Sequence, residues 1–246
     1  MRSPFTIALA NAPMFGQASH AKCLATFSTA ENTWRATRND FLATGIEPHR
    51  IDQFIAWRAT QDPMSLVATM DQQNIRLIGQ EDPEYPPLLN MIFDPPAYLF
   101  AKGGLLIHRS TVAMVGSREC TVYGKETAQK LAKDLARGGL SIVSGGANGI
   151  DQASHEGALA ANGHTIAVLG SGLLGIDNTR HNGLFDRILS SGGTIITEFP
   201  LRTPPYKSNF PLRNRIVSGM CRATIIVEAA LPSGTMITAE AATKEN

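Results

Sequence analysis

Cysteine is scarce in this sequence, and its spacing excludes a disulfide framework and a metal site. The three cysteines in 246 residues, Cys23, Cys120 and Cys221, lie far apart and form no Cys-x-x-Cys or Cys/His pattern. We therefore expect no bound metal, and a reduced, cytoplasmic setting suits this cysteine usage. No stretch approaches the roughly 18 apolar residues of a membrane helix, and the mixed run of residues 5–10 is too short for a secretory signal.

The chain also lacks the strong net charge of a protein that attracts nucleic acid with its whole surface. Its formal net charge is +1 and its isoelectric point is near 7.8. Any nucleic-acid site must therefore arise from local clustering of cations. Hydrophobic residues make up 43% of the sequence, which is enough for a sizeable core and argues against global disorder.

Residues 1–72 have the spacing of short helices. Ile51, Phe54 and Ile55 recur at helical intervals in a segment that runs to Arg58, and Pro48 suits its first turn. Further helices are expected at residues 19–27 and 33–37, and Asp62-Pro63 is expected to open another that runs through Leu66 to Met70. Residues 12–27 and 42–57 each have a helix-Gly-turn-helix outline, which can offer amides to a DNA phosphate or simply pack in a bundle. Because neither turn carries basic residues, the packing role is favoured.

From Thr111 onward, short apolar runs alternate with helical segments. This alternation predicts a parallel sheet with helices on both faces, in which ligands bind at the carboxyl ends of the strands. Two more strands are expected in the preceding bridge of residues 73–108, at residues 75–78 and 98–101. The later strands are expected at 112–115, 140–143, 165–169, 194–197 and 224–227, and the helices at 122–137, 150–161, 181–189, 209–218 and from 235.

Glycine-rich loops follow the expected strands and suit an anion. Glycine lets a backbone approach a ligand, amides at a helix start hold a phosphate, and an arginine adds a bidentate contact. Three glycines within residues 145–149 make the strongest signal of an anion-binding nest, and Asp151 behind them is expected to cap the helix rather than to orient the loop. The loop residues predicted to contact the anion are Gly116, Ser117, Arg118, Ser144, Gly145, Gly146, Asn148, Gly149, Gly234 and Thr235.

A local positive strip lies between residues 199 and 227. It holds Arg202, Lys207, Arg213, Arg215 and Arg222 with no acidic residue among them. Tyr206 and Phe210 are interleaved with these cations, a combination typical of single-strand binding because exposed bases stack on aromatic rings. A solvated loop with its aromatic rings folded inward is the other interpretation. The strip residues predicted to contact DNA are Lys207, Phe210, Arg213, Asn214 and Arg215.

Catalytic and cofactor motifs are scarce. The loops match neither GxGxxG nor GxxxxGK[ST], so no nicotinamide, ATP or other cofactor is expected. There is no GxSxG or HExxH motif and no suggestive pair of carboxylates. Glu198 and Glu228 end strands on the ligand side and are the best acid or base candidates, whereas His155 and His181 are isolated. We therefore predict no catalytic residue and a binding protein rather than an enzyme.

In combination, these motifs resemble the DNA processing protein A family, also called DprA or Smf. Residues 82–86 and 94–96 resemble the family's bridge, and the helical N-terminus is similar to its SAM-like domain. The motifs that carry the resemblance are Gly116-Ser117-Arg118, residues 144–151 (Ser-Gly-Gly-Ala-x-Gly-Ile-Asp), residues 210–216 (Phe-Pro-x-Arg-Asn-Arg-Ile) and Ser233-Gly234-Thr235.

The resemblance implies a fold, an activity and partners. The fold is α/β: an extended Rossmann-like parallel sheet with helices on both faces over residues 73–246, preceded by a small all-α SAM-like domain over residues 1–72. The family binds single-stranded DNA, protects incoming strands in natural transformation, loads RecA recombinase and dimerises through the Rossmann domain. By motif, Arg118 is similar to the family's pocket arginine, Lys207 and Phe210 to its lysine and base-stacking aromatic, and Arg213 and Arg215 to its basic loop.

Two features depart from the family pattern. Residues 176–178 stand where the family has a Tyr-Pro pair, and the sequence stops at Asn246 where the family continues into segments that form its dimer and RecA surfaces.

Two other functions remain open for this sequence. One alternative is a nucleotide-hydrolysing enzyme of the LOG-like phosphoribohydrolase type, which would release adenine from AMP and lose turnover in Glu198→Gln. The other is a structural adaptor whose loops bind only a small anion.

Overall fold

The N-terminal part of the chain is helical, as its sequence spacing predicts. The computed structural model describes residues 2–106, 110–176 and 183–229. Phe41, Ile51 and Phe54 are fully buried in the centre of this region, where the ring of Phe15 stacks on Phe54 with 4.5 Å between centroids. Its helices are α1 (Pro4–Ala10), α2 (Gln17–Phe27), α3 (Ala30–Arg35), α4 (Arg38–Leu42), α5 (Pro48–Arg58) and α6 (Pro63–Gln72).

Two of these helices are absent from the sequence expectations, and local caps explain both. Helix α1 starts where Ser3 accepts a hydrogen bond from the Thr6 amide, with proline in the first turn. Helix α4 starts with a capping box between Thr37 and Asp40. Both helices are too short for hydrophobic periodicity to reveal them, so the caps are the only local signal.

A seven-stranded sheet forms the rest of the described structure, in the order β1-β2-β6-β5-β4-β3-β7. From β6 to β7 neighbouring strands are parallel, as expected, whereas β1 and β2 are antiparallel additions from the predicted bridge. The sheet is therefore mixed rather than wholly parallel. The strands are β1 (Ile75–Gly79), β2 (Tyr98–Gly103), β3 (Thr111–Gly116), β4 (Ser141–Ser144), β5 (Thr165–Val168), β6 (Thr194–Thr197) and β7 (Ala223–Val227).

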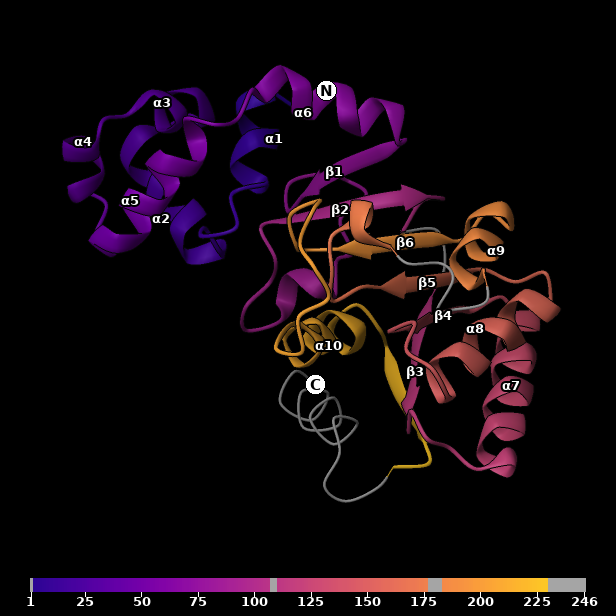
Figure 1. Cartoon of the computed structure of the whole chain (residues 1–246). Coiled ribbons are helices and arrows are strands. Elements are labelled where there is room, and N and C mark those ends of the chain that lie inside the picture. Colours follow the sequence, from indigo (N-terminus) through magenta and orange to yellow (C-terminus); the bar gives the residue numbers. More distant parts are fainter. Residues whose placement is uncertain (1, 107–109, 177–182, 230–246) are drawn as a thin grey trace.

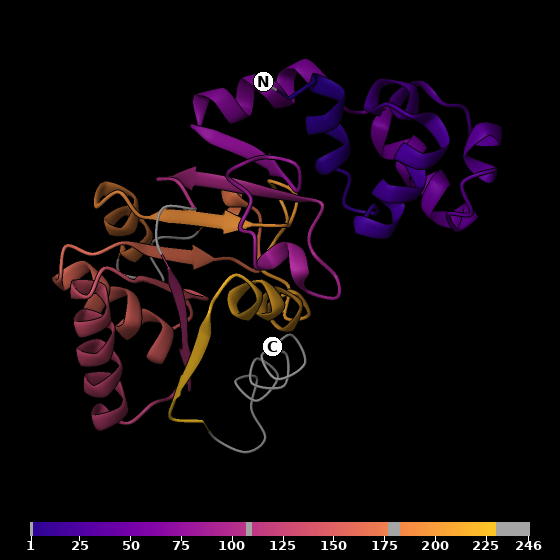
Figure 2. The same ribbon diagram turned by 180° about the vertical axis from the view of Figure 1, so that it is seen from behind.

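Helices cover both faces of this sheet, which confirms the predicted α/β class (Figures 1 and 2). Ala113 and Val115 of β3 pack in one core cluster with α10 (Asn209–Gly219), whereas Met114 between them packs with α7 (Val122–Arg137) and α8 (Ile150–Ala160). Alternating residues of a strand point to opposite faces, so β3 is buried on both sides. Helix α9 (Leu184–Ser190) and the short 3-10 turns η1 (Leu89–Met91) and η2 (Leu173–Gly175) complete the described elements.

The helical N-terminal region is attached to the sheet through α1 and α6. Figure 1 shows these two helices between the sheet and the group α2–α5. Ile7 and Met70 share a core cluster with Leu201. The Leu201 amide also donates a 3.0 Å hydrogen bond to Asn11 Oδ1. In the part of the chain described, no helix is long and apolar enough to cross a membrane, and no cluster of metal-binding side chains occurs.

We predict that two buried histidines make this fold sensitive to acid. Burial lowers the pKa of His155 to about 3 and that of His20 to about 4. In the unfolded chain each histidine takes up a proton near pH 6.5, but in the fold neither does, so stability is full above that pH and falls as the pH drops toward 4. Each histidine contributes roughly 1 kcal/mol per pH unit in this window. Urea unfolding between about pH 7.5 and about pH 5 measures the slope.

The control for this prediction separates these histidines from other ionisable groups. His155→Gln cannot ionise and is expected to reduce the slope by about half, because His20 remains, and adding His20→Gln is expected to remove the rest. An equal slope in the wild type and His155→Gln would contradict the assignment.

Candidate functional site

The loop after β3 is anchored by the end of β7, at the carboxyl edge of the parallel strands. The Ser117 amide donates a 2.8 Å hydrogen bond to the Glu228 carbonyl oxygen, and the Ser117 carbonyl accepts one from the Ile150 amide at 3.1 Å. The Glu228 carboxylate accepts from the amide and hydroxyl of Thr121 at 2.8 Å and 2.7 Å. Glu228 therefore joins β7 to the start of α7, which does not favour its use as a catalytic base.

Asp151 holds the glycine-rich loop after β4, instead of capping α8 as the sequence favoured. Its buried carboxylate accepts hydrogen bonds from the amides of Gly145 and Ala147 at 3.1 Å and 3.3 Å. The N-cap residue of α8 is Gly149, which receives no side-chain cap. Burial raises the pKa of Asp151, while Arg213 and the two loop amides act in the opposite direction.

Arg213 is the interior partner of this loop, which corrects its expected place on a DNA-binding surface. The residue lies on α10 and is only 3% exposed. Its guanidinium donates to the carbonyl oxygens of Gly145, at 2.6 Å, and of Val168. Because these bonds link α10 to the ends of β4 and β5, Arg213 positions the loop and is not accessible to a strand. Ser144 and Gly145 are buried beside it, so they are equally poor candidates for direct contact.

The remaining amides of the loop are available to an anion. Those of Gly146, Asn148 and Gly149 donate to no acceptor in the described part of the chain. Gly146 and Gly149 have φ angles of +69° and +82°, and a Cβ on Gly149 would collide with the carbonyl oxygens of Ser117 and Arg118. Asn148 is exposed, Gly149 is partly exposed and Gly146 is buried. Of the anion nest predicted from the sequence, only the amides around Asn148 are therefore both unpaired and accessible within the described residues.

Arg118 and Phe210 meet across the site, although they are far apart in the sequence. The Arg118 guanidinium carbon lies over the Phe210 ring, 5.1 Å from its centroid. Gly170, after β5, leaves room for this ring, since a Cβ there would lie 3.0 Å from Phe210 Cδ1. Arg118 is exposed and makes no ion pair within the described residues. The edge therefore carries an accessible cation on an aromatic ring.

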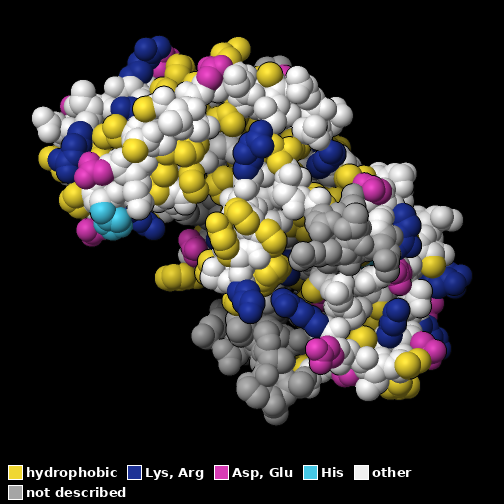
Figure 3. Space-filling view, in the orientation of Figure 1, with side chains coloured by type: hydrophobic (Ala, Val, Ile, Leu, Met, Phe, Trp, Pro, Cys, Tyr) yellow, Lys and Arg dark blue, Asp and Glu magenta, His cyan; other side chains and the backbone are white. Residues whose placement is uncertain are grey.

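Lys207 extends this surface before α10. It is exposed and, within the described ranges, unpaired. Tyr206 beside it is 57% exposed, so its ring is not folded into the core. Figure 3 shows Lys and Arg side chains next to hydrophobic ones where Figure 1 draws α10.

Two other cations of the strip have different surroundings. Arg215 is bound to Glu198 at 2.6 Å and lies 3.5 Å from Asp94, so acidic partners distant in the sequence neutralise it. Burial raises the pKa of Glu198, and the guanidinium of Arg215 opposes that rise. Arg222 precedes β7, whose first residue pairs with Val112 near the start of β3, so it lies at the opposite end of the sheet.

The structure thus brings together part of the predicted site. Gly116, Ser117, Arg118, Asn148, Gly149, Lys207 and Phe210 lie on the accessible edge or its loops. Asn214 accepts from Arg213 Nε at 3.2 Å and supports the interior network. Gly234, Thr235, His181 and the expected helix from residue 235 lie outside the described residues. The sequence did not reveal that Asp94 faces Arg215 or that Gly170 leaves room for the Phe210 ring, because each contact joins residues far apart in the chain.

Comparison with known proteins identifies a family and several relatives that this chain resembles in sequence. Residues 76–246 match the family described as DNA recombination-mediator protein A. Protein Smf from Escherichia coli is 40% identical over 203 residues, covering 82% of this chain and 54% of the relative. DNA processing protein DprA from Bacillus subtilis is 39% identical over 176 residues, covering 71% of this chain and 59% of the relative. The chain spans little more than half the length of these curated relatives.

Solved structures extend the likeness to the fold. The X-ray structure of DprA from Streptococcus pneumoniae superposes with a TM-score of 0.78 at 32% identity, covering 99% of this chain and 84% of that one. DNA processing protein A from Helicobacter pylori, whose structure describes a single-stranded DNA binding mode, has a TM-score of 0.61 at 32% identity, covering 69% and 77% of the two chains.

Proposed function

We propose that this chain, which belongs to the DNA recombination-mediator protein A family, binds single-stranded DNA at the carboxyl edge of its sheet. The observation that carries the proposal is the contact between Arg118 and Phe210 beside the open amides of Asn148 and Gly149. A flexible strand presents phosphates and bases side by side, and this edge offers one kind of partner for each.

Each accessible group takes a separate part in this proposal. The loop amides near Asn148 bind one phosphate, and Arg118 and Lys207 bind its neighbours. When Arg118 turns to a phosphate, the Phe210 ring is uncovered and a base stacks on it. None of these contacts reads the edge of a base, so the binding tolerates any sequence. Arg213 and Asp151 take no part in the contact and keep the loop in position.

The wider role rests on the family and on the relatives' names. We propose that the protein acts on single strands in the cytoplasm during DNA processing and recombination, protects incoming strands in transformation, and loads RecA onto them. A homodimer through the Rossmann domain belongs to the same proposal. We propose a binding protein and not a nucleotide hydrolase, since Glu198 is held by Arg215 and Glu228 by Thr121, which leaves neither carboxylate free to activate water.

The test is a titration of fluorescently labelled oligothymidylate at several salt concentrations. Two accessible cations, Arg118 and Lys207, predict a slope of about −1.4 in a plot of log affinity against log salt, at about 0.7 per neutralised phosphate. Affinity is then expected to fall by about sevenfold when salt rises from about 50 to about 200 mM. Binding that is absent, or that ignores salt, would refute the proposal.

A further inference from the structure

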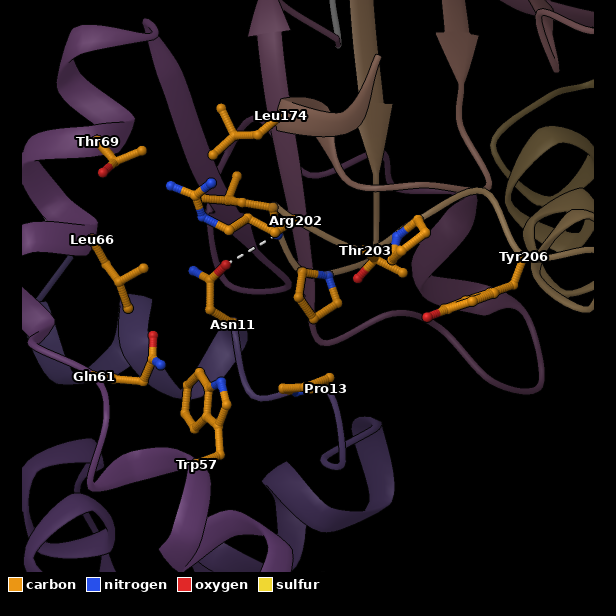
Figure 4. A pocket seen from close by; sticks show the side chains of 13 residues that line it. Asn11, Pro13, Trp57, Gln61, Leu66, Thr69, Leu174, Arg202, Thr203 and Tyr206 are labelled. Carbon is orange, nitrogen blue, oxygen red and sulfur yellow. Dashed lines mark hydrogen bonds between the residues drawn. The ribbon is translucent and has the colours of Figure 1, made fainter. Parts of the chain in front are cut away.

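A second concave site lies between the helical N-terminal region and the loop that precedes α10. Its cavity has a volume of about 300 Å³, at the lower end of the range for small-ligand sites. Figure 4 shows Trp57, Gln61 and Thr69 on the helical side, with Arg202 and Tyr206 on the loop side. The cavity thus combines residues from both parts of the molecule.

The lining of this cavity suits a nucleotide. Trp57 is only partly buried, which leaves part of its indole for a planar ring, and Gln61 carries an amide that can pair with the edge of a base. Arg202 is exposed, and none of the described residues that line the cavity carries a carboxylate. Its guanidinium also has no acidic partner in the described part of the chain, so it is available to a phosphate.

The chain segment that lines the cavity leads on to Phe210, which contacts Arg118. Tyr206 stands at its rim, and the Asn209 amide donates a 3.0 Å hydrogen bond to the Tyr206 carbonyl, forming the turn into α10. Residues 202–210 therefore run from the cavity to Phe210, with cations at Arg202 and Lys207 and no acidic residue between them. A polyanion bound at Phe210 finds its next favourable charges along this segment.

We propose that this cavity is a second nucleotide site for the same strand, which rests on the proposed binding of single-stranded DNA. The base lies against Trp57, and the adjoining phosphate binds Arg202. The hydrogen bond from Leu201 to Asn11 holds the two walls together, so the site is formed before DNA arrives. This assigns a task to the helical region: it supplies one wall of the strand's path.

Fluorescence of a single tryptophan tests this assignment. The sequence has two tryptophans, so Trp34→Phe leaves Trp57 as the only reporter, and Trp57→Phe leaves Trp34. An oligothymidylate of about 16 nucleotides is expected to quench Trp57, whereas one of about 4 nucleotides, which fits at Phe210 alone, is not; these lengths bracket common single-strand site sizes. Trp34 does not line the cavity, but its ring lies 6.0 Å from that of Trp57, so its emission is expected to change much less than that of Trp57.

Arg202→Gln provides a second test that does not depend on tryptophan variants. It is expected to weaken the longer oligomer by about tenfold and to lower the size of its salt slope by about 0.7, with no effect on the shorter one. Arg222→Gln, at the opposite end of the sheet, is the matched control. If the anisotropy of the label shows that the wild type binds neither oligomer, the proposed function and this site are both refuted.

Other outcomes overturn the second site alone. If the longer oligomer binds with unchanged Trp57 emission and Arg202→Gln equals Arg222→Gln, the strand does not enter the cavity. Quenching of Trp57 by thymidine monophosphate, with none by the longer oligomer, would assign the cavity to a free nucleotide and overturn its place on the strand.

Discussion

Replacing Arg118 with alanine is expected to weaken binding of single-stranded DNA by about ten- to a hundredfold for every base sequence. A hydrogen-bonded charge contact contributes about 1.5–3 kcal/mol, and about 1.4 kcal/mol corresponds to a tenfold change. Arg118 has no ion pair within the described residues, so its removal leaves no buried carboxylate behind and stability should change little. The loss should therefore appear in binding and not in folding.

Anisotropy titrations with oligothymidylate and with a mixed-sequence oligomer measure this effect. The salt slope of the variant should be smaller in size than that of the wild type by about 0.7, because one phosphate contact is lost. Arg118→Lys should retain most of the slope, because its ammonium still neutralises a phosphate, but it should bind less tightly because it lacks the bidentate guanidinium. Arg222→Ala is the control for charge. A loss of less than about threefold, or an unchanged slope, would exclude Arg118 from the strand's path.

The pairing of Arg118 with Phe210 follows from sequence because it depends on topology. Both residues lie where loops or helices begin after parallel strands, and the carboxyl ends of such strands share one edge of the sheet. The alternation of strands and helices after Thr111 is strong enough to establish that topology. The sequence does not establish the direction of β1 and β2, because their apolar runs have no pattern that distinguishes parallel from antiparallel pairing.

For the cations of residues 199–227, the sequence does not predict which side chains are accessible to DNA. Arg213 and Arg215 are two positions apart, yet one is buried against carbonyl oxygens and the other pairs with Glu198. Nothing local distinguishes them from Lys207, because their partners come from β4, β5 and the end of β6. A count of cations along the chain therefore overestimates how many of them can contact DNA. Whether a guanidinium can do so depends on its burial and its partners in the fold.

Arg213→Leu is expected to lower the free energy of unfolding by about 3–5 kcal/mol, because the buried Asp151 charge loses the cation that stabilises it. The substitution leaves the Asp151 carboxylate buried and removes donors from the carbonyl oxygens of Gly145 and Val168. Binding should weaken in parallel, because the amides around Asn148 lose their support. Urea unfolding of the wild type and the variant measures the first effect.

The pH dependence distinguishes this mechanism from a simple loss of packing. Burial already raises the pKa of Asp151, and without the cation that pKa rises further above its unfolded value. A raised carboxyl pKa stabilises the fold fully below the unfolded pKa, and this contribution is lost as pH rises through the folded pKa. The cost of Arg213→Leu should therefore be largest at high pH and shrink on acidification. Asp151→Asn combined with Arg213→Leu should remove this pH dependence, since no charge remains to be buried, whereas a cost that is equal at every pH would show that lost packing dominates.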